Sequence, residues 1–165
     1  MAKEKDRAPA GANARRELRA NILASRAGDL GIKESSDCRR VWGVVVDWPV
    51  GDQIATVVAL CDGNASLYTT STFGVLGGVG HSDVRRAAVA LVRDADRFHA
   101  DGKATTDRSY PSAGRIRFHL LAFDGVRVVE DDQKSIEAGK NRYSALFGRA
   151  QDVLTELCKV TESRK

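Results

Sequence analysis

Residues 41–71, VWGVVVDWPVGDQIATVVALCDGNASLYTTS, decide the fold of this chain. The stretch contains three runs rich in β-branched and aromatic residues, at 41–48, 54–61 and 65–71, and this composition is typical of β-strands. The last two runs are separated by the tripeptide DGN, and Gly and Asn accept the positive φ angles of a tight hairpin turn. The sequence therefore predicts three consecutive antiparallel strands joined by short turns.

A helix is predicted from Ser82 onward, because apolar residues recur there at helical spacing. The apolar positions are Val84, Ala87, Ala88, Leu91, Val92, Ala95 and Phe98. Ser82 is a suitable N-cap, and Asp83 places a negative charge in the first turn, where the helix dipole favours it. One face of this helix is expected to lie on the sheet and the other in water.

Flanking segments add two helices and two strands. Helices are predicted over 13–28 and 144–160, strands over 115–123 and 126–130, and polar loops over 103–114 and 131–142. An α+β fold follows, in which helices pack on an antiparallel sheet of about five strands in the order α-βββ-α-ββ-α. Residues 1–12 are predicted to be a flexible basic leader, and residues 13–165 a single domain.

The composition predicts a location in the cytoplasm. No run approaches the roughly 18 apolar residues of a membrane span, and the charged N-terminus lacks the apolar core of a secretory signal. The three cysteines form no CxxC pair, and an odd count argues against a disulfide framework. Cys38, Cys61 and Cys158 are therefore expected to be isolated thiols.

The net charge of +4 is concentrated at the N-terminus. Residues 1–28 hold seven basic and three acidic side chains, and the remainder of the chain balances at 19 of each sign. Such an arm can associate with nucleic acid or an acidic partner. A solvated leader followed by an ordinary charged helix face is the simpler interpretation, because no aromatic residues are interleaved with the basic ones.

The segment that leads into the helix at Ser82 is rich in glycine. Residues 73–80 read FGVLGGVG, and they follow the third strand directly. Glycines here either form a bulged strand end that lets the helix pack closely, or let the backbone approach a partner or ligand. For a protein partner, the predicted contacts are the apolar residues of this segment together with one nearby tryptophan: Phe73, Val75, Leu76, Val79 and Trp48.

The same segment also permits a small anionic ligand. A glycine-rich turn before a helix presents backbone N–H groups and the positive end of the helix dipole. The residues predicted to bind such a ligand are Gly77, Gly78, Gly80, His81 and Ser82. The lysine of a P-loop is absent, and the glycine spacing differs from that of dinucleotide-binding turns.

Other polar residues show no spacing typical of catalysis or metal binding. His81, His99 and His119 are far apart and lack metal-ligand spacing; His119 is expected to be a cross-strand or edge polar group. Glu130, Asp131, Asp132 and Glu137 could hold a divalent cation, but a solvated loop is the favoured interpretation. No catalytic residue, metal or cofactor is predicted, and the chain is not expected to be an enzyme.

Alternation along the first strand gives two further expectations. Asp47 lies between Val46 and Trp48 and is expected to point outward. Trp42 and Trp48 are six residues apart, so an ideal strand would project both from the same face.

Three stretches resemble a sequence pattern of small uncharacterised bacterial proteins that have no assigned activity. They are VVALCDGNASLYTTSTFGVLGGVGH, RIRFHLLAFDGVRVVE and SALFGRAQDVLTEL. The alternation of strands and flanking helices also resembles, at the level of the fold alone, the roadblock, longin and profilin-like adaptors, which implies dimerisation. The predicted order of three strands, helix and two strands departs from the roadblock order of two and then three.

The sequence favours a non-enzymatic bacterial module that binds another protein, as a homodimer or within a larger assembly. The alternative is a sensor or enzyme that binds a phosphate-bearing ligand or nucleotide at residues 77–82. A third hypothesis is association with nucleic acid through the basic arm.

Overall fold

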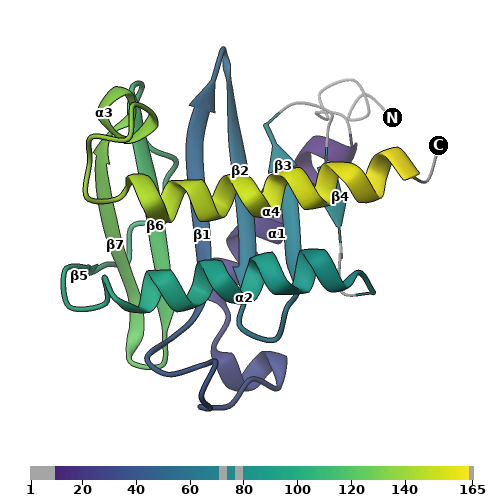
Figure 1. The fold of residues 1–165 in the computed structure, drawn as a ribbon, viewed down its shortest axis with the longest axis vertical. Coiled ribbons are helices and arrows are strands. Elements are labelled where there is room, and N and C mark those ends of the chain that lie inside the picture. Colours follow the sequence, from purple (N-terminus) through teal and green to yellow (C-terminus); the bar gives the residue numbers. More distant parts are fainter. Residues whose placement is uncertain (1–9, 71–73, 77–79, 164–165) are drawn as a thin grey trace, which may run out of the picture.

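A seven-stranded antiparallel sheet forms the centre of the molecule (Figure 1). The computed structural model describes residues 10–70, 74–76 and 80–163. The strand order is β4-β3-β2-β1-β6-β7-β5. The strands are β1 (Val41–Val50), β2 (Gln53–Leu60), β3 (Ala65–Thr69), β4 (Gly74–Leu76), β5 (Lys103–Ala104), β6 (Arg115–Ala122) and β7 (Gly125–Asp132).

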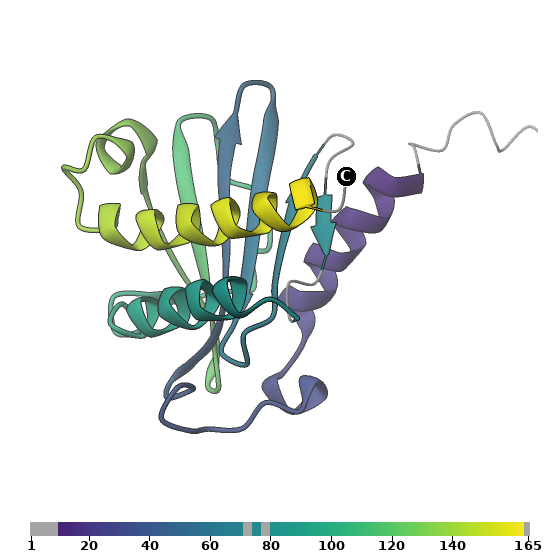
Figure 2. The ribbon, with the colours of Figure 1, turned by 45° about the vertical axis from the view of Figure 1, so that its right-hand side comes forward.

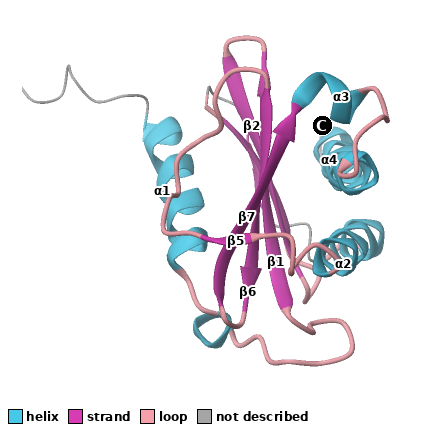
Figure 3. Cartoon of the chain, turned by 90° about the vertical axis from the view of Figure 1, so that its left-hand side faces the viewer, coloured by secondary structure: helices cyan, strands magenta, loops and turns pink. Residues whose placement is uncertain are grey.

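Helices cover both faces of this sheet. They are α1 (Ala10–Ala24), α2 (Ser82–Asp96), α3 (Gln133–Glu137) and α4 (Ser144–Ser163), with a 3-10 turn, η1, at Ala27–Leu30. Figure 2 shows α2 and α4 running side by side across the strands, and Figure 3 shows α1 on the opposite face. The predicted α+β fold is confirmed, and within the described residues no helix is long and apolar enough to cross a membrane.

Tight hairpins set the order of the central strands. Gly51, Gly63 and Gly125 have φ angles of +63°, +94° and +124°, which only glycine adopts readily. Gly51 and Gly63 lie in the β1–β2 and β2–β3 turns, and Gly125 is the first residue of β7, directly after the β6–β7 turn. The predicted strands at 41–48, 54–61, 65–71, 115–123 and 126–130 all appear, with shifted ends. The sheet gains two short edge strands, β4 and β5, beyond the roughly five predicted.

The face under α2 and α4 forms one part of the apolar core. The predicted stripe of α2 is buried at Val84, Ala88, Leu91, Val92 and Ala95. On α4, Phe147 meets the ring of Trp48 edge to face, with 5.4 Å between centroids. The N-cap of α2 is His81 and not Ser82, because His81 keeps an extended backbone and Ser82 is already helical. The His81 side chain makes no capping hydrogen bond.

The two tryptophans of β1 lie on opposite sides of the sheet, contrary to the prediction. The pairing of β1 with β6 shifts register between Val41 and Gly43, which is a β-bulge, and a bulge breaks the alternation of side chains. Trp42 therefore lines a cleft with Leu23 of α1, whereas Trp48 packs against α4.

Cys38 and Cys61 form a disulfide, so the expectation of three isolated thiols is wrong. Their Cα atoms are 5.6 Å apart. The disulfide joins the connector before β1 to the residue that follows β2. The Cys61 N–H also donates a hydrogen bond to the Trp42 carbonyl at 2.9 Å. Disulfides are typical of oxidising compartments, so cysteine usage no longer supports a cytoplasmic location.

Two further segments differ from the sequence prediction. The segment 131–142, predicted as a loop, contains α3, whose N-cap Asp132 accepts a hydrogen bond from the Ser135 N–H at 2.9 Å. Helix α1 already begins at Ala10, inside the predicted leader.

Candidate functional site

The glycine-rich segment lies at an edge of the sheet. Its central part is β4, which pairs with β3 through Leu67↔Val75 and Ser66↔Leu76. Gly80 is exposed, and a Cβ atom at this position would meet nothing within 4 Å. His81 is half-buried and Ser82 is exposed. Phe73, Gly77, Gly78 and Val79 lie outside the described residues, so the predicted anion site stays a prediction.

A groove lies between α4 and the β1–β2 hairpin, and we call it the hairpin groove. It has a volume of about 650 Å³. Its described lining residues are Trp48, Pro49, Val50, Gln53, Ala55, Leu67, Thr69, Glu137, Gln151, Leu154 and Cys158. Trp48, predicted as a partner contact, is only 5% exposed and forms part of the groove wall, whereas Val50 is 54% exposed at the end of its strand.

The face under α1 holds a buried ion pair that the sequence analysis missed. Asp47 points inward, not outward as predicted, and is fully buried. Its carboxylate accepts from Nε and Nη2 of Arg19 at 3.1 and 2.7 Å, and from the hydroxyl of Thr56 at 2.5 Å. The signal in the sequence was the spacing of Arg19 and Leu23, which places both on one face of α1.

The same network fixes the loop before β6. Arg19 Nη1 donates to the carbonyl of Arg108 at 2.7 Å, and its guanidinium lies over the ring of Tyr110 at 4.1 Å. Arg117 Nη1 donates to the Ser109 carbonyl at 2.8 Å, and His119 Nε2 lies 3.1 Å from the Asp107 carbonyl. Three consecutive carbonyls, at 107–109, are thus held by side chains from α1 and β6.

His119 is fully buried in β6, not at an edge. Because a carbonyl only accepts, Nε2 carries the proton and donates to Asp107, which leaves Nδ1 as an unprotonated acceptor. Nδ1 has no hydrogen-bond partner among the described residues. Burial lowers the pKa of His119, although the Asp107 carbonyl and the charge of Asp47 partly oppose this effect. His119 is therefore a neutral structural group.

The predicted acidic cluster is divided between separate roles. Glu130 accepts from Arg117 Nε at 2.9 Å, and Asp132 caps α3. Glu137 accepts from the side chain of Gln133 at 3.0 Å. In the part of the chain that the structure describes, no group of three or more His, Cys, Asp or Glu side chains is placed to hold a metal ion.

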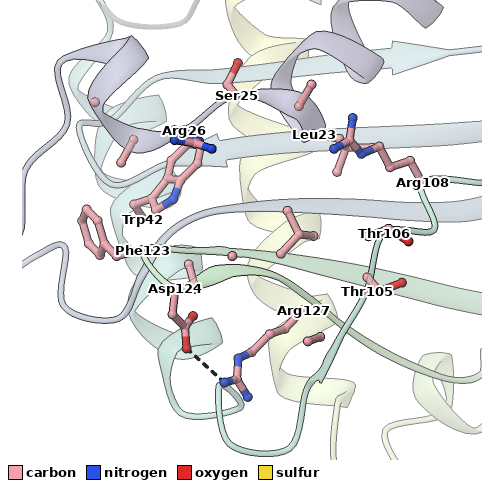
Figure 4. Close-up of a pocket in the computed structure, with 17 residues that line it drawn as sticks. Leu23, Ser25, Arg26, Trp42, Thr105, Thr106, Arg108, Phe123, Asp124 and Arg127 are labelled. Atoms are coloured by element: carbon pink, nitrogen blue, oxygen red, sulfur yellow. Dashed lines mark hydrogen bonds and ion pairs between the residues drawn. The ribbon is translucent and has the colours of Figure 1, made fainter.

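A larger cleft of about 830 Å³ opens beside α1, and we call it the arginine cleft (Figure 4). Its walls come from the end of α1, the start of η1, residues 104–108 and the β6–β7 hairpin. Arg26, Arg108, Arg127 and Asp124 are the charged residues among its described lining. The sequence analysis missed this cleft, because its arginines come from segments far apart in the chain.

The basic arm is partly neutralised within the fold. Arg19, one of its seven basic residues, is buried against Asp47, so its charge is not available to an external partner. Arg16 is exposed. Comparison of the chain with protein-family models, curated proteins and solved structures finds no match.

Proposed function

We propose that this chain is a non-enzymatic protein-interaction module that acts as a homodimer through the hairpin groove. The observation that carries the proposal is an apolar groove whose lining includes an exposed valine, Val50. Apolar surface of this kind, rimmed by polar side chains, is typical of interaction sites.

The charges of the groove favour an apolar occupant. Glu137 is the only charged residue among its described lining. Its carboxylate already accepts a hydrogen bond from Gln133. Val50, which is exposed, and Leu154, which is half-buried, would lose contact with water when apolar side chains enter, and this loss is the main favourable contribution to association.

We propose self-association because the patch offers both an apolar groove and an exposed apolar side chain. A two-fold interface uses the same surface on both copies, so that surface must be complementary to itself. Val50 is exposed at the end of β1, where the chain turns toward β2, and it is itself one of the residues that line the groove. In a two-fold dimer, Val50 of each copy can enter the groove of the other.

The glycine-rich edge can extend this interface. A stable interface buries about 800 Å² on each partner, so it must reach beyond a single groove. Leu67 lines the groove and is paired with Val75 across the β3–β4 ladder, which places the predicted contacts Val75 and Leu76 on the neighbouring strand. Phe73 directly precedes β4 in the sequence and Val79 follows its last residue by three positions, and both stay proposed contacts.

The test is the mass of the protein in solution, measured by size-exclusion chromatography with light scattering. Val50→Asp places a charge in the proposed interface, and we expect it to raise the dimer dissociation constant by at least about tenfold. Leu30→Asp is the matched control, because Leu30 is also an exposed large apolar residue, 40% exposed, but lies on η1 outside the hairpin groove.

A dimer that Val50→Asp dissociates and Leu30→Asp preserves would support the proposal. A wild-type protein that stays monomeric at all accessible concentrations would contradict it. Equal dissociation by both variants would place the interface elsewhere.

A further inference from the structure

We propose that the arginine cleft binds a small organic anion through phosphate or carboxylate groups. Residues of α1 line the cleft and residues of α4 line the hairpin groove, and Figure 3 shows these two helices on opposite faces of the sheet. The proposal therefore goes beyond the homodimer and does not depend on it.

The charge balance of the cleft is positive. Arg127 Nη2 contacts Asp124 at 3.0 Å, and Nη1 of the same side chain donates to the carbonyls of His99 and Gly102. Asp124 also lies 3.1 Å from Nε2 of His99. These two residues thus satisfy each other and leave two further guanidinium groups in the lining.

Arg26 and Arg108 are those two groups, and both side chains are exposed. Within the described residues, neither guanidinium forms an ion pair or a side-chain hydrogen bond. Asp29 accepts from the backbone N–H of Arg26, and Arg108 contributes only its carbonyl to the Arg19 network. Guanidinium groups bind phosphate and carboxylate through paired hydrogen bonds.

The wall that carries Arg108 is held in place before any ligand arrives. His119, Arg19 and Arg117 hold the carbonyls of the three consecutive residues 107–109. Thr105 N–H donates to the Val126 carbonyl at 3.0 Å, which ties the start of the same segment to β7. Because the backbone of this wall is already ordered, less conformational entropy is lost when Arg108 binds a ligand.

Apolar side chains also line the cleft, among them Leu23 and Trp42. Figure 4 shows the Arg26 side chain next to Trp42 and the Arg108 side chain directed toward Leu23. Val126 also lines the cleft, and the exposed Thr106 adds a hydroxyl on the Arg108 wall. Small-molecule sites typically combine such an apolar lining with a few polar groups in a volume of about 300–1,000 Å³. The cleft thus fits an anion with an organic body better than a bare inorganic ion.

Isothermal titration calorimetry on the full chain tests the proposal in two arms. The phosphate arm uses inorganic phosphate, pyrophosphate and adenosine monophosphate, and the carboxylate arm uses glutarate and citrate. Arg26→Gln and Arg108→Gln should each weaken binding of the best probe by roughly ten- to hundredfold, because each removes a charge-assisted contact. Arg85→Gln is the control, because Arg85 is also exposed but lies on α2.

A conservative variant distinguishes the loss of an anion contact from a general loss of folding. Arg108→Lys keeps the charge but loses the paired geometry, so its affinity should fall between those of the wild type and Arg108→Gln. Binding in either arm that follows this order and weakens with salt would support the proposal and identify the anionic group. No binding in either arm, or binding that both glutamine variants leave unchanged, would overturn it.

Discussion

The two faces of the sheet are built from different chemistry, although the same strands form both. On β1, Val44 and Val46 lie on the face that packs against α2 and α4, whereas Asp47 lies on the face under α1. The first face is closed by apolar side chains such as Leu91 and Phe118. The second also buries the apolar residues Leu23 and Trp42, but Arg19 and its hydrogen bonds to Asp47 and to the loop before β6 lie among them.

This difference explains how each helix is positioned on the sheet. Apolar contacts are non-directional, so α2 and α4 gain stability from buried area more than from particular atom pairs. The guanidinium fork of Arg19 instead requires Asp47 on β1 and the carbonyls of 108 and 109 at fixed positions. A buried ion pair stabilises little overall but is costly to break, so it selects one placement of α1 against others.

Breaking the ion pair gives the largest expected effect. Asp47→Ala leaves the buried Arg19 guanidinium without its counter-charge, and it should lower the free energy of unfolding by about 3–5 kcal/mol. Urea denaturation measures this change. The double variant Arg19→Met/Asp47→Leu should regain most of the loss, since apolar replacements of both partners remove the uncompensated charge.

The same variant should also disturb the arginine cleft. Arg19 without Asp47 no longer has a fixed position from which to hold the Arg108 carbonyl. Anion affinity should therefore fall in Asp47→Ala measured under conditions where the protein is folded. If the free energy of unfolding of Asp47→Ala lies within about 1 kcal/mol of that of the wild type, the ion pair is not structurally important, since breaking such pairs ordinarily costs more.

A cavity on the apolar face should have a smaller and purely structural effect. Leu91 is fully buried between α2 and the sheet, and Leu91→Ala should lower the free energy of unfolding by about 3 kcal/mol. Urea denaturation again measures it. Calorimetry on the folded variant should show unchanged anion affinity, because the cleft is on the other face. A loss of affinity equal to that of Asp47→Ala would remove the distinction between the faces.

The sequence predicted those parts of the fold that depend on local pattern. The stripe of α2 and the turns at Gly63 and Gly125 each need only a short stretch of chain. The edge strands β4 and β5, three and two residues long, are defined by pairing and are too short to show a period. The bulge after Val41 reversed the expected side of Trp42, because pairing with β6 decides it.

The candidate sites depended almost wholly on contacts between distant residues. Arg19 and Asp47 are 28 residues apart, and only the position of α1 against the sheet brings them together. Cys38 and Cys61 are 23 positions apart in the sequence, and they also meet only because the fold brings their two segments together. Of the predicted contact residues, Trp48 lines the hairpin groove, but its small exposed fraction could not be read from strand alternation.

The smallest predicted effect is a pH dependence on the polar face. Burial lowers the pKa of His119 below its ordinary value of about 6.5. Protonation would add a proton to Nδ1, which has no acceptor among the described residues. At a pH well above about 6.5 the residue is neutral in both the folded and the unfolded state. As the pH falls from there, the unfolded chain binds a proton that the folded chain does not, so the free energy of unfolding decreases until the pH passes the lowered pKa.

Denaturation profiles of the wild type and His119→Leu isolate this term. The difference in the free energy of unfolding between the two proteins should change as the pH falls below 7 and then level off. Its total change should be about 1.4 kcal/mol if the pKa of His119 differs by one between the folded and the unfolded state. The lowered pKa values of Asp96 and Asp131 act at lower pH, below their unfolded value of about 3.9, and are common to both proteins. Parallel profiles between pH 5 and 7 would mean that His119 is protonated equally in both states and that the α1 face accepts a buried cation at this position.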